Sequence, residues 1–72
     1  MDKQRFLDMM VDVLDTDQDL TMDTQLSNLD EWDSLAILSF MASADMKLKK
    51  RVNAAKVKVA ATIGDLYALC TE

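Results

Sequence analysis

The sequence predicts an all-α fold, a bundle of three main helices and one short helix with a long loop after the first. Three observations support this. The 72 residues include no proline and one glycine, the residues that most often interrupt helices. Apolar residues recur at intervals of three and four rather than two. Six methionines suit an adaptable core. We expect residues 1–72 to form a single domain.

The first helix is predicted over residues 2–15, with Asp2 capping its start. An apolar stripe follows its length: Phe6, Met10, Val13 and Leu14. Residues 16–33 then form a connection that is long for a compact domain. Five apolar residues within it can hold the loop against the bundle: Leu20, Met22, Leu26, Leu29 and Trp32. We therefore expect a packed functional loop.

The second helix is predicted from Ser34 to Met46, with Asp33 as its N-cap. It is apolar on nearly every side, so part of its surface is either core or a docking face. One line comprises Leu38, Met41 and Asp45, with Ile37 and Ala44 beside it. Another comprises Leu35, Ala42 and Met46, and Phe40 also needs a place in the core.

A basic connection at residues 47–53 precedes a short helix over residues 54–59, for which Asn53 is the expected cap. Thr62 is expected to begin a last helix that reaches Cys70. Thr62 and Asp65 have the spacing of a capping box, with Asp in place of Glu or Gln. Its core stripe is expected to be Ile63, Leu66, Leu69 and Cys70.

The charge is divided unevenly along the chain. Residues 1–35 hold ten acidic and two basic residues, whereas residues 36–72 hold three acidic and six basic ones. The acidic half disfavours nucleic acid and favours basic protein partners. The run Lys47–Arg51 is short and lacks aromatic residues, so we expect a solvated loop there. No stretch predicts a membrane span or a secretory signal, so we expect a cytoplasmic monomer that binds no membrane.

The chain contains no histidine, which excludes Ser-His-Asp and Cys-His catalytic pairs and histidine metal ligands. We therefore expect no enzymatic activity. Cys70 is the only cysteine and cannot form an internal disulfide, which fits a reducing compartment. With no histidine and no evident nearby cation to lower its pKa, we expect a core or surface cysteine near the C-terminus.

Two acidic clusters have a functional and a structural interpretation. Residues 15–19 match the opening of an EF-hand loop, but Leu20 and Leu26 stand where that loop requires Gly and Glu. The end of a helix followed by acidic turn residues is the simpler interpretation. Asp30, Glu31 and Asp33 suggest paired catalytic carboxylates, yet consecutive exposed acids are normally solvated. They are better placed to steer a basic partner toward Ser34.

Ser34 itself occupies the predicted start of the second helix. The first N–H groups of a helix lack intrahelical partners, and the helix dipole places partial positive charge there. A phosphate attached to a serine at this end is stabilised by both effects. A capped helix with an unused exposed serine is the structural alternative.

The chain resembles the phosphopantetheine-binding acyl and peptidyl carrier proteins along essentially its whole length. Leu29-Asp30-Glu31-Trp32-Asp33-Ser34-Leu35 is similar to the attachment motif of the family, with Ser34 as the modified serine. Thr62-Ile63-Gly64-Asp65-Leu66 is similar to the signature that opens the family's last helix. The separation of the motifs, the long first loop and the short third helix also agree.

The resemblance implies a four-helix acyl-carrier-protein-like bundle that carries covalent 4′-phosphopantetheine on Ser34. A phosphopantetheinyl transferase would donate this group from coenzyme A. A loading ligase and acyl-processing enzymes would be the other partners, in fatty-acid, polyketide or nonribosomal-peptide biosynthesis. The carrier itself would hold an acyl or aminoacyl thioester and act as a free-standing chain.

The second helix departs from the carriers of fatty-acid synthesis, which have glutamates on its partner face. Here the corresponding residues are Ala36, Ser39, Met46 and Lys47, and only Asp45 is acidic. This departure favours a carrier dedicated to another pathway. We expect the partner-binding residues to be Asp33, Leu35, Ala36, Ser39, Ala42 and Met46. The alternative is a small helical adaptor with Ser34 unmodified, which binds a partner helix through Leu35, Ala42 and Met46.

Overall fold

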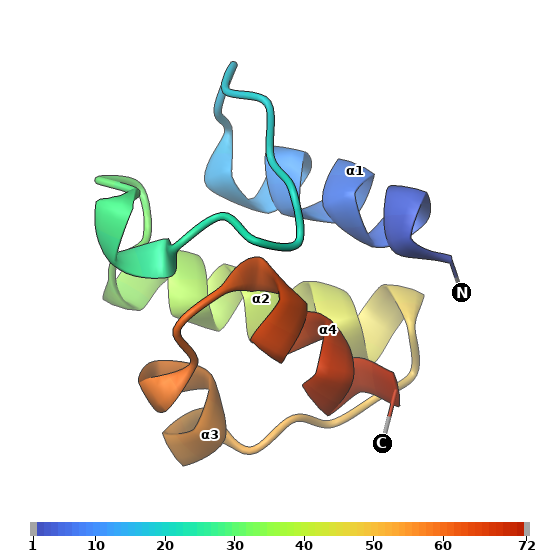
Figure 1. Ribbon diagram of the computed structural model, residues 1–72. Helices are drawn as coiled ribbons and strands as arrows, with labels where there is room; N and C mark the ends of the chain where they lie inside the picture. The colour runs from blue at the N-terminus through green and yellow to red at the C-terminus, as the bar shows by residue number, and fades with distance from the viewer. Residues whose placement is uncertain (1, 72) are drawn as a thin grey trace.

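The computed structural model describes residues 2–71 and contains four α-helices and one short 3-10 helix (Figure 1). The α-helices are α1 (Lys3–Leu14), α2 (Ser34–Lys47), α3 (Ala54–Val59) and α4 (Ile63–Thr71), and the 3-10 helix is η1 (Leu26–Asn28). Helices α1 and α2 run antiparallel, and α4 crosses in front of α2 in this view. The prediction of a small all-α bundle is confirmed.

The helix boundaries follow the caps expected from the sequence. The Asp2 carboxylate accepts a hydrogen bond from Arg5 N–H at 2.8 Å, and the Asn53 side chain accepts one from Ala55 N–H at 2.8 Å. At the start of α4, Asp65 Oδ2 accepts from Thr62 N–H at 3.2 Å, and Thr62 Oγ1 accepts from Asp65 N–H at 3.2 Å. This reciprocal pair confirms the capping box.

The core is built around Phe6, whose ring is fully buried between those of Phe40 and Tyr67. Its centroid lies 6.1 Å from that of Phe40 and 5.3 Å from that of Tyr67, both edge to face. Edge-to-face pairs place the positive rim of one ring on the negative face of another. The core therefore joins α1, α2 and α4 through three aromatic side chains.

The buried face of α2 follows neither of the two lines distinguished in the sequence. Ala36, Phe40 and Ala44 face the core, whereas Leu38, expected on the same line as Met41, is 63% exposed. Because α2 is apolar on nearly every side, the position of its apolar residues does not show which side is buried. Two alanines flank Phe40 at spacings of four, and such small side chains allow close packing.

The long first loop is hydrogen-bonded to the start of α4. Leu26 N–H donates to the Ala61 carbonyl at 2.9 Å, and Gly64 N–H donates to the Met22 carbonyl at 2.8 Å. A Cβ on Gly64 would lie 3.0 Å from that Met22 oxygen, so the close approach requires glycine. Together with the burial of Leu20, Leu26 and Leu29, these bonds confirm the prediction of a packed loop.

Two residues other than glycine adopt left-handed backbone conformations where helices end. Asp15 has φ 50° after α1, and Lys49 has φ 54° after α2. The turn at Lys49 directs the chain back, so that Lys50 N–H donates to the Ala44 carbonyl at 3.2 Å. The basic connection is therefore an ordered reversal over the C-terminal end of α2.

Candidate functional site

Asp33 fixes the start of α2 and hence the position of Ser34. Its backbone is extended, and its carboxylate accepts a hydrogen bond from Ala36 N–H at 2.9 Å. The carbonyl of Asp33 also accepts from Ile37 N–H at 2.9 Å, which is the first turn of the helix. The predicted N-cap is thus confirmed, and Ser34 becomes the first helical residue.

Ser34 is exposed, and its hydroxyl makes no hydrogen bond with any residue that the structure describes. The N–H groups of Ser34 and Leu35 also lack acceptors among residues 2–71, because Asp33 occupies only Ala36 N–H. Both groups lie at the positive end of the α2 dipole. An anion carried on the Ser34 oxygen would therefore lie beside two unused donors.

Trp32 anchors the segment that leads into Ser34. Its backbone N–H donates to the Leu29 carbonyl at 3.1 Å, and Leu29 directly follows η1. Its ring meets Phe40 edge to face at a centroid distance of 6.2 Å. Because Phe40 is fully buried, this contact ties the approach to Ser34 to the aromatic core.

An apolar stripe runs along the solvent side of α2 from Ser34 toward the end of the helix. We call it the α2 outer stripe, and it comprises Leu35, Leu38, Ala42 and Met46, all of which are exposed. The exposed fraction is 72% for Leu35 and 79% for Met46. Spacings of three, four and four place the four residues on one side of the helix.

The stripe changes the set of partner-binding residues expected from the sequence. Leu35, Ala42 and Met46 are exposed as expected, and Ser39 is half-buried beside them. Ala36, in contrast, is only 6% exposed and belongs to the core, because it lies about a quarter turn from the stripe. Leu38 belongs to the exposed stripe instead. Its spacing from Leu35 and Ala42 is the sequence signal that could have identified it as part of this stripe.

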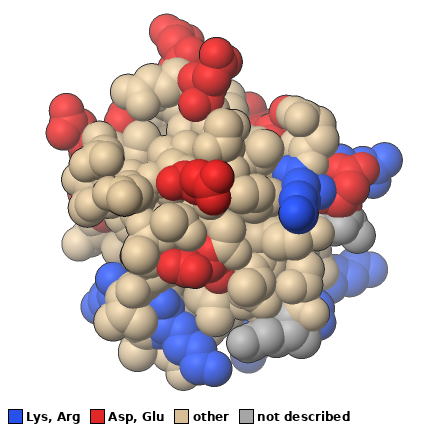
Figure 2. All heavy atoms as spheres, viewed as in Figure 1, with Lys and Arg blue, Asp and Glu red and all other residues tan. Residues whose placement is uncertain are grey.

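Acidic side chains surround the start of α2. Asp30 and Asp33 are exposed and Glu31 is half-buried. Figure 2 shows acidic side chains at the end formed by the first loop, at the top, and basic side chains over α3 at the lower left. Acidic side chains also lie at the centre and at the right of this view, so the separation in space is partial. A basic partner surface is attracted toward the loop end of the molecule.

The EF-hand resemblance at residues 15–19 corresponds to the end of α1. Asp15 is the left-handed cap of that helix, and the buried Thr16 accepts a hydrogen bond from Gln18 N–H at 3.1 Å. Across residues 2–71, no three Cys, Asp or Glu side chains gather into a group that could hold a metal ion.

Cys70 is 3% exposed and lies in the core at the end of α4. Burial raises the pKa of its thiol above the ordinary value of 9.0, and the nearby positive charge of Lys50 partly opposes this rise in pKa. The expectation that no cation lies near Cys70 was therefore wrong: the reversal at Lys49 brings Lys50 to it. The neutral thiol is favoured all the same, because desolvation is the larger effect.

No helix among the described residues is long and apolar enough to cross a membrane. Comparison with protein-family models found no match, and comparisons with curated proteins and with solved structures found no significant match.

Proposed function

We propose that this chain is a carrier that holds an acyl or aminoacyl group as a thioester on 4′-phosphopantetheine attached to Ser34. The observation that carries the proposal is the placement of Ser34. Ser34 is the first residue of a capped helix. It is exposed, and its hydroxyl makes no hydrogen bond with the described residues. A hydroxyl so placed is open to an external enzyme, and its phosphodiester would meet the positive end of α2.

The residues around Ser34 fit such a group. The N–H groups of Ser34 and Leu35 are available to phosphate oxygens, because Asp33 caps the helix through Ala36 N–H. The contact of the Trp32 ring with the buried Phe40 ring fixes the segment before Ser34 to the core. When bound, the group supplies a terminal thiol that forms the thioester. The chain itself positions the serine, leaves it exposed and offers partners a surface.

The proposed partners are a phosphopantetheinyl transferase, a loading ligase and downstream acyl-processing enzymes. Asp30, Glu31 and Asp33 provide an acidic rim beside Ser34, and the α2 outer stripe continues from it. A partner with a basic rim around an apolar groove complements this surface. Such encounters are fast and weak, which suits a cytoplasmic monomer that visits several enzymes in turn.

We propose a pathway other than housekeeping fatty-acid synthesis. Along the stripe, Asp45 is the one acidic neighbour within α2, so a partner that relies on several basic contacts with this helix finds few here. The proposed carrier therefore serves a dedicated biosynthetic pathway. It would be overturned if fatty-acid synthase enzymes loaded and extended the modified protein at the rate of their own carrier.

The exposed apolar stripe favours one second candidate, a helical adaptor with Ser34 unmodified. Leu35, Leu38 and Met46 are large apolar side chains that monomeric proteins rarely align in the open. In this case a partner helix would lie along the stripe, and covalent modification would play no part. The two candidates differ in whether Ser34 reacts.

The deciding measurement is intact mass after incubation with coenzyme A and a broad-specificity phosphopantetheinyl transferase. A carrier gains one phosphopantetheinyl group. The gain is lost in Ser34→Ala and kept in Ser39→Ala, which removes a half-buried hydroxyl from the same helix. A folded protein that gains no mass in this experiment contradicts the proposal and favours the adaptor.

A further inference from the structure

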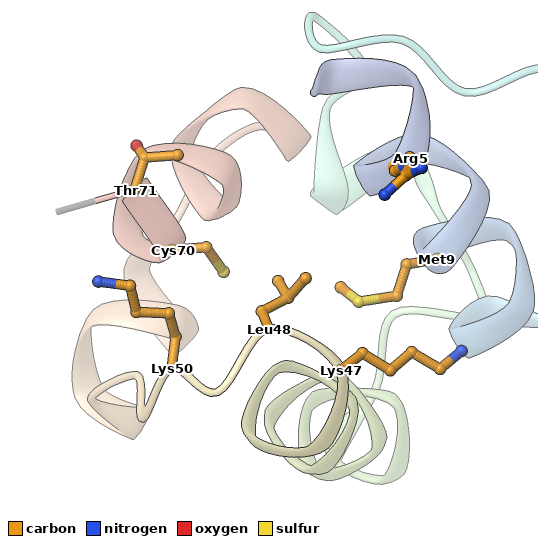
Figure 3. Close-up of a pocket in the computed structure, with 7 residues that line it drawn as sticks. All are labelled: Arg5, Met9, Lys47, Leu48, Lys50, Cys70 and Thr71. Carbon is orange, nitrogen blue, oxygen red and sulfur yellow. The ribbon is translucent and has the colours of Figure 1, made fainter. Parts of the chain in front are cut away.

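A cavity of about 660 Å³ opens at the opposite end of the bundle from Ser34, between the first turns of α1 and the last turns of α2 and α4. Figure 3 shows its lining, and Figure 1 shows that both chain ends lie on this side. The 14 residues of α2 separate it from Ser34 by about 20 Å. The cavity is therefore distinct from the candidate attachment site.

The centre of the cavity is apolar. Leu48 lies between Met9 and Cys70, and the two sulfur-bearing side chains point toward it from opposite sides (Figure 3). Met9 and Cys70 are buried, and Leu48 is half-buried. These three side chains form a surface on which a short hydrocarbon chain can lie.

The wall around this centre is cationic. Arg5, Lys47 and Lys50 line the cavity, and no Asp or Glu among residues 2–71 is part of its lining. This is unusual in a chain with 13 acidic and 8 basic residues. Neither Arg5 nor Lys47 has a carboxylate partner among the residues that the structure describes. A site with positively charged walls and an apolar centre is complementary to an anion that carries a hydrocarbon chain.

Arg5 and Lys47, which have no carboxylate partner among the described residues, lie at opposite kinds of helix end. Lys47 is in the last turn of α2, where the exposed carbonyl groups favour a positive charge. Arg5 is in the first turn of α1, where the dipole disfavours a positive charge, and the N-cap Asp2 supplies the one negative charge at this end. Arg5 is exposed and lines the cavity. An anion bound in the cavity would further offset the positive charge at this end of α1.

We propose that this cavity binds an aliphatic carboxylate, whose chain lies on Met9, Leu48 and Cys70 and whose carboxylate accepts hydrogen bonds from Arg5 and Lys47. The volume lies within the range of small-molecule sites, about 300–1,000 Å³. Arginine and lysine pair with carboxylates through charge-assisted hydrogen bonds. The inference does not depend on the carrier proposal, because Ser34 takes no part in this site.

The test is titration of the Ser34→Ala protein with octanoate, followed by the backbone amide spectrum in nuclear magnetic resonance. We expect saturable shifts centred on Met9, Leu48 and Cys70. The double variant Arg5→Gln/Lys47→Gln should bind octanoate about tenfold more weakly or worse, since it loses both charged donors. Lys47→Gln alone should show a smaller loss. 1-Octanol, which has the chain without the charge, should bind at least about tenfold more weakly.

Lys58→Gln is the matched control, because it removes an exposed positive charge from α3 outside the cavity. It should leave octanoate binding unchanged. The proposal is overturned if Lys58→Gln weakens binding as much as the double variant, which would indicate general charge attraction. It is also overturned if octanol binds as well as octanoate, if the shifts centre on the α2 outer stripe, or if no saturable binding occurs. Use of Ser34→Ala keeps every outcome independent of modification.

Discussion

Replacing Asp33 by alanine should loosen the start of α2 without altering the core. The change removes the carboxylate that accepts from Ala36 N–H at 2.9 Å and leaves that donor to water. Removal of an N-cap side chain typically costs about 1 kcal/mol of stability, within a range of about 0.5–2 kcal/mol. Because Asp33 also lies at the positive end of the α2 dipole, we expect a loss of about 1 kcal/mol or slightly more.

In a domain of this size, a loss of about 1 kcal/mol lowers the melting temperature by roughly 4–8 °C. The assay is urea unfolding followed by circular dichroism, with thermal melting as a second measurement. The dependence of the unfolding free energy on urea should not change, because the buried surface is the same. Asp33→Asn should retain most of the stability, since asparagine is an equally good cap.

Asp30→Ala is the control for charge alone. Asp30 is exposed and precedes the helix, and no hydrogen bond joins its side chain to the described residues. Its removal should alter stability by less than about 0.5 kcal/mol. The reasoning is refuted if Asp33→Ala and Asp30→Ala are equally stable, or if Asp33→Asn loses as much stability as Asp33→Ala. Either result would mean that the capping bond does not hold the start of α2.

Three further changes test other parts of the structure. Lys49→Gly should stabilise the protein by up to about 1 kcal/mol in urea unfolding, because Lys49 has φ 54° and glycine adopts this conformation without cost; Lys49→Ala, which removes the same charge, should bring no such gain. Gly64→Val should lower the unfolding free energy by about 1–3 kcal/mol, because a Cβ would lie 3.0 Å from the Met22 oxygen; an unchanged melting temperature would contradict the close approach. The raised pKa of Cys70 means that the unfolded chain loses its thiol proton first as the pH rises through 9.0, so stability should fall above that pH. The fall should be smaller in Cys70→Ala, measured by urea unfolding from pH 8 to pH 10.

The local features of the fold could be predicted from the sequence. Asp2, Asp33 and Asn53 cap the helices as expected, since a cap depends on residues within three positions of it. The capping box of Thr62 and Asp65 is likewise a local pattern. The burial of Leu26 and Leu29 could be expected because isolated leucines in a long polar loop need a partner surface.

The remaining features depend on residues distant in sequence. The buried side of α2 could not be read from its pattern, because the helix is apolar all round and the position of Phe6 decides which side is covered. Ala36 was therefore expected among the partner-binding residues although it is buried, and Leu38 was not, although it is exposed. Lys50 reaches Cys70 only through the left-handed turn at Lys49, a conformation that the sequence Lys-Lys does not indicate.

The hydrogen bonds between the first loop and α4 have a consequence for the order of events during synthesis. The carbonyl of Met22 and the N–H of Leu26 find their partners at Gly64 and Ala61, which lie 42 and 35 residues further along the chain. A ribosome-bound chain that ends before α4 already contains Trp32, Asp33 and Ser34, yet its first loop lacks these partners. The loop that leads to Ser34 is thus completed only when α4 emerges, and an enzyme that recognises the folded loop would distinguish chains that contain α4 from shorter ones.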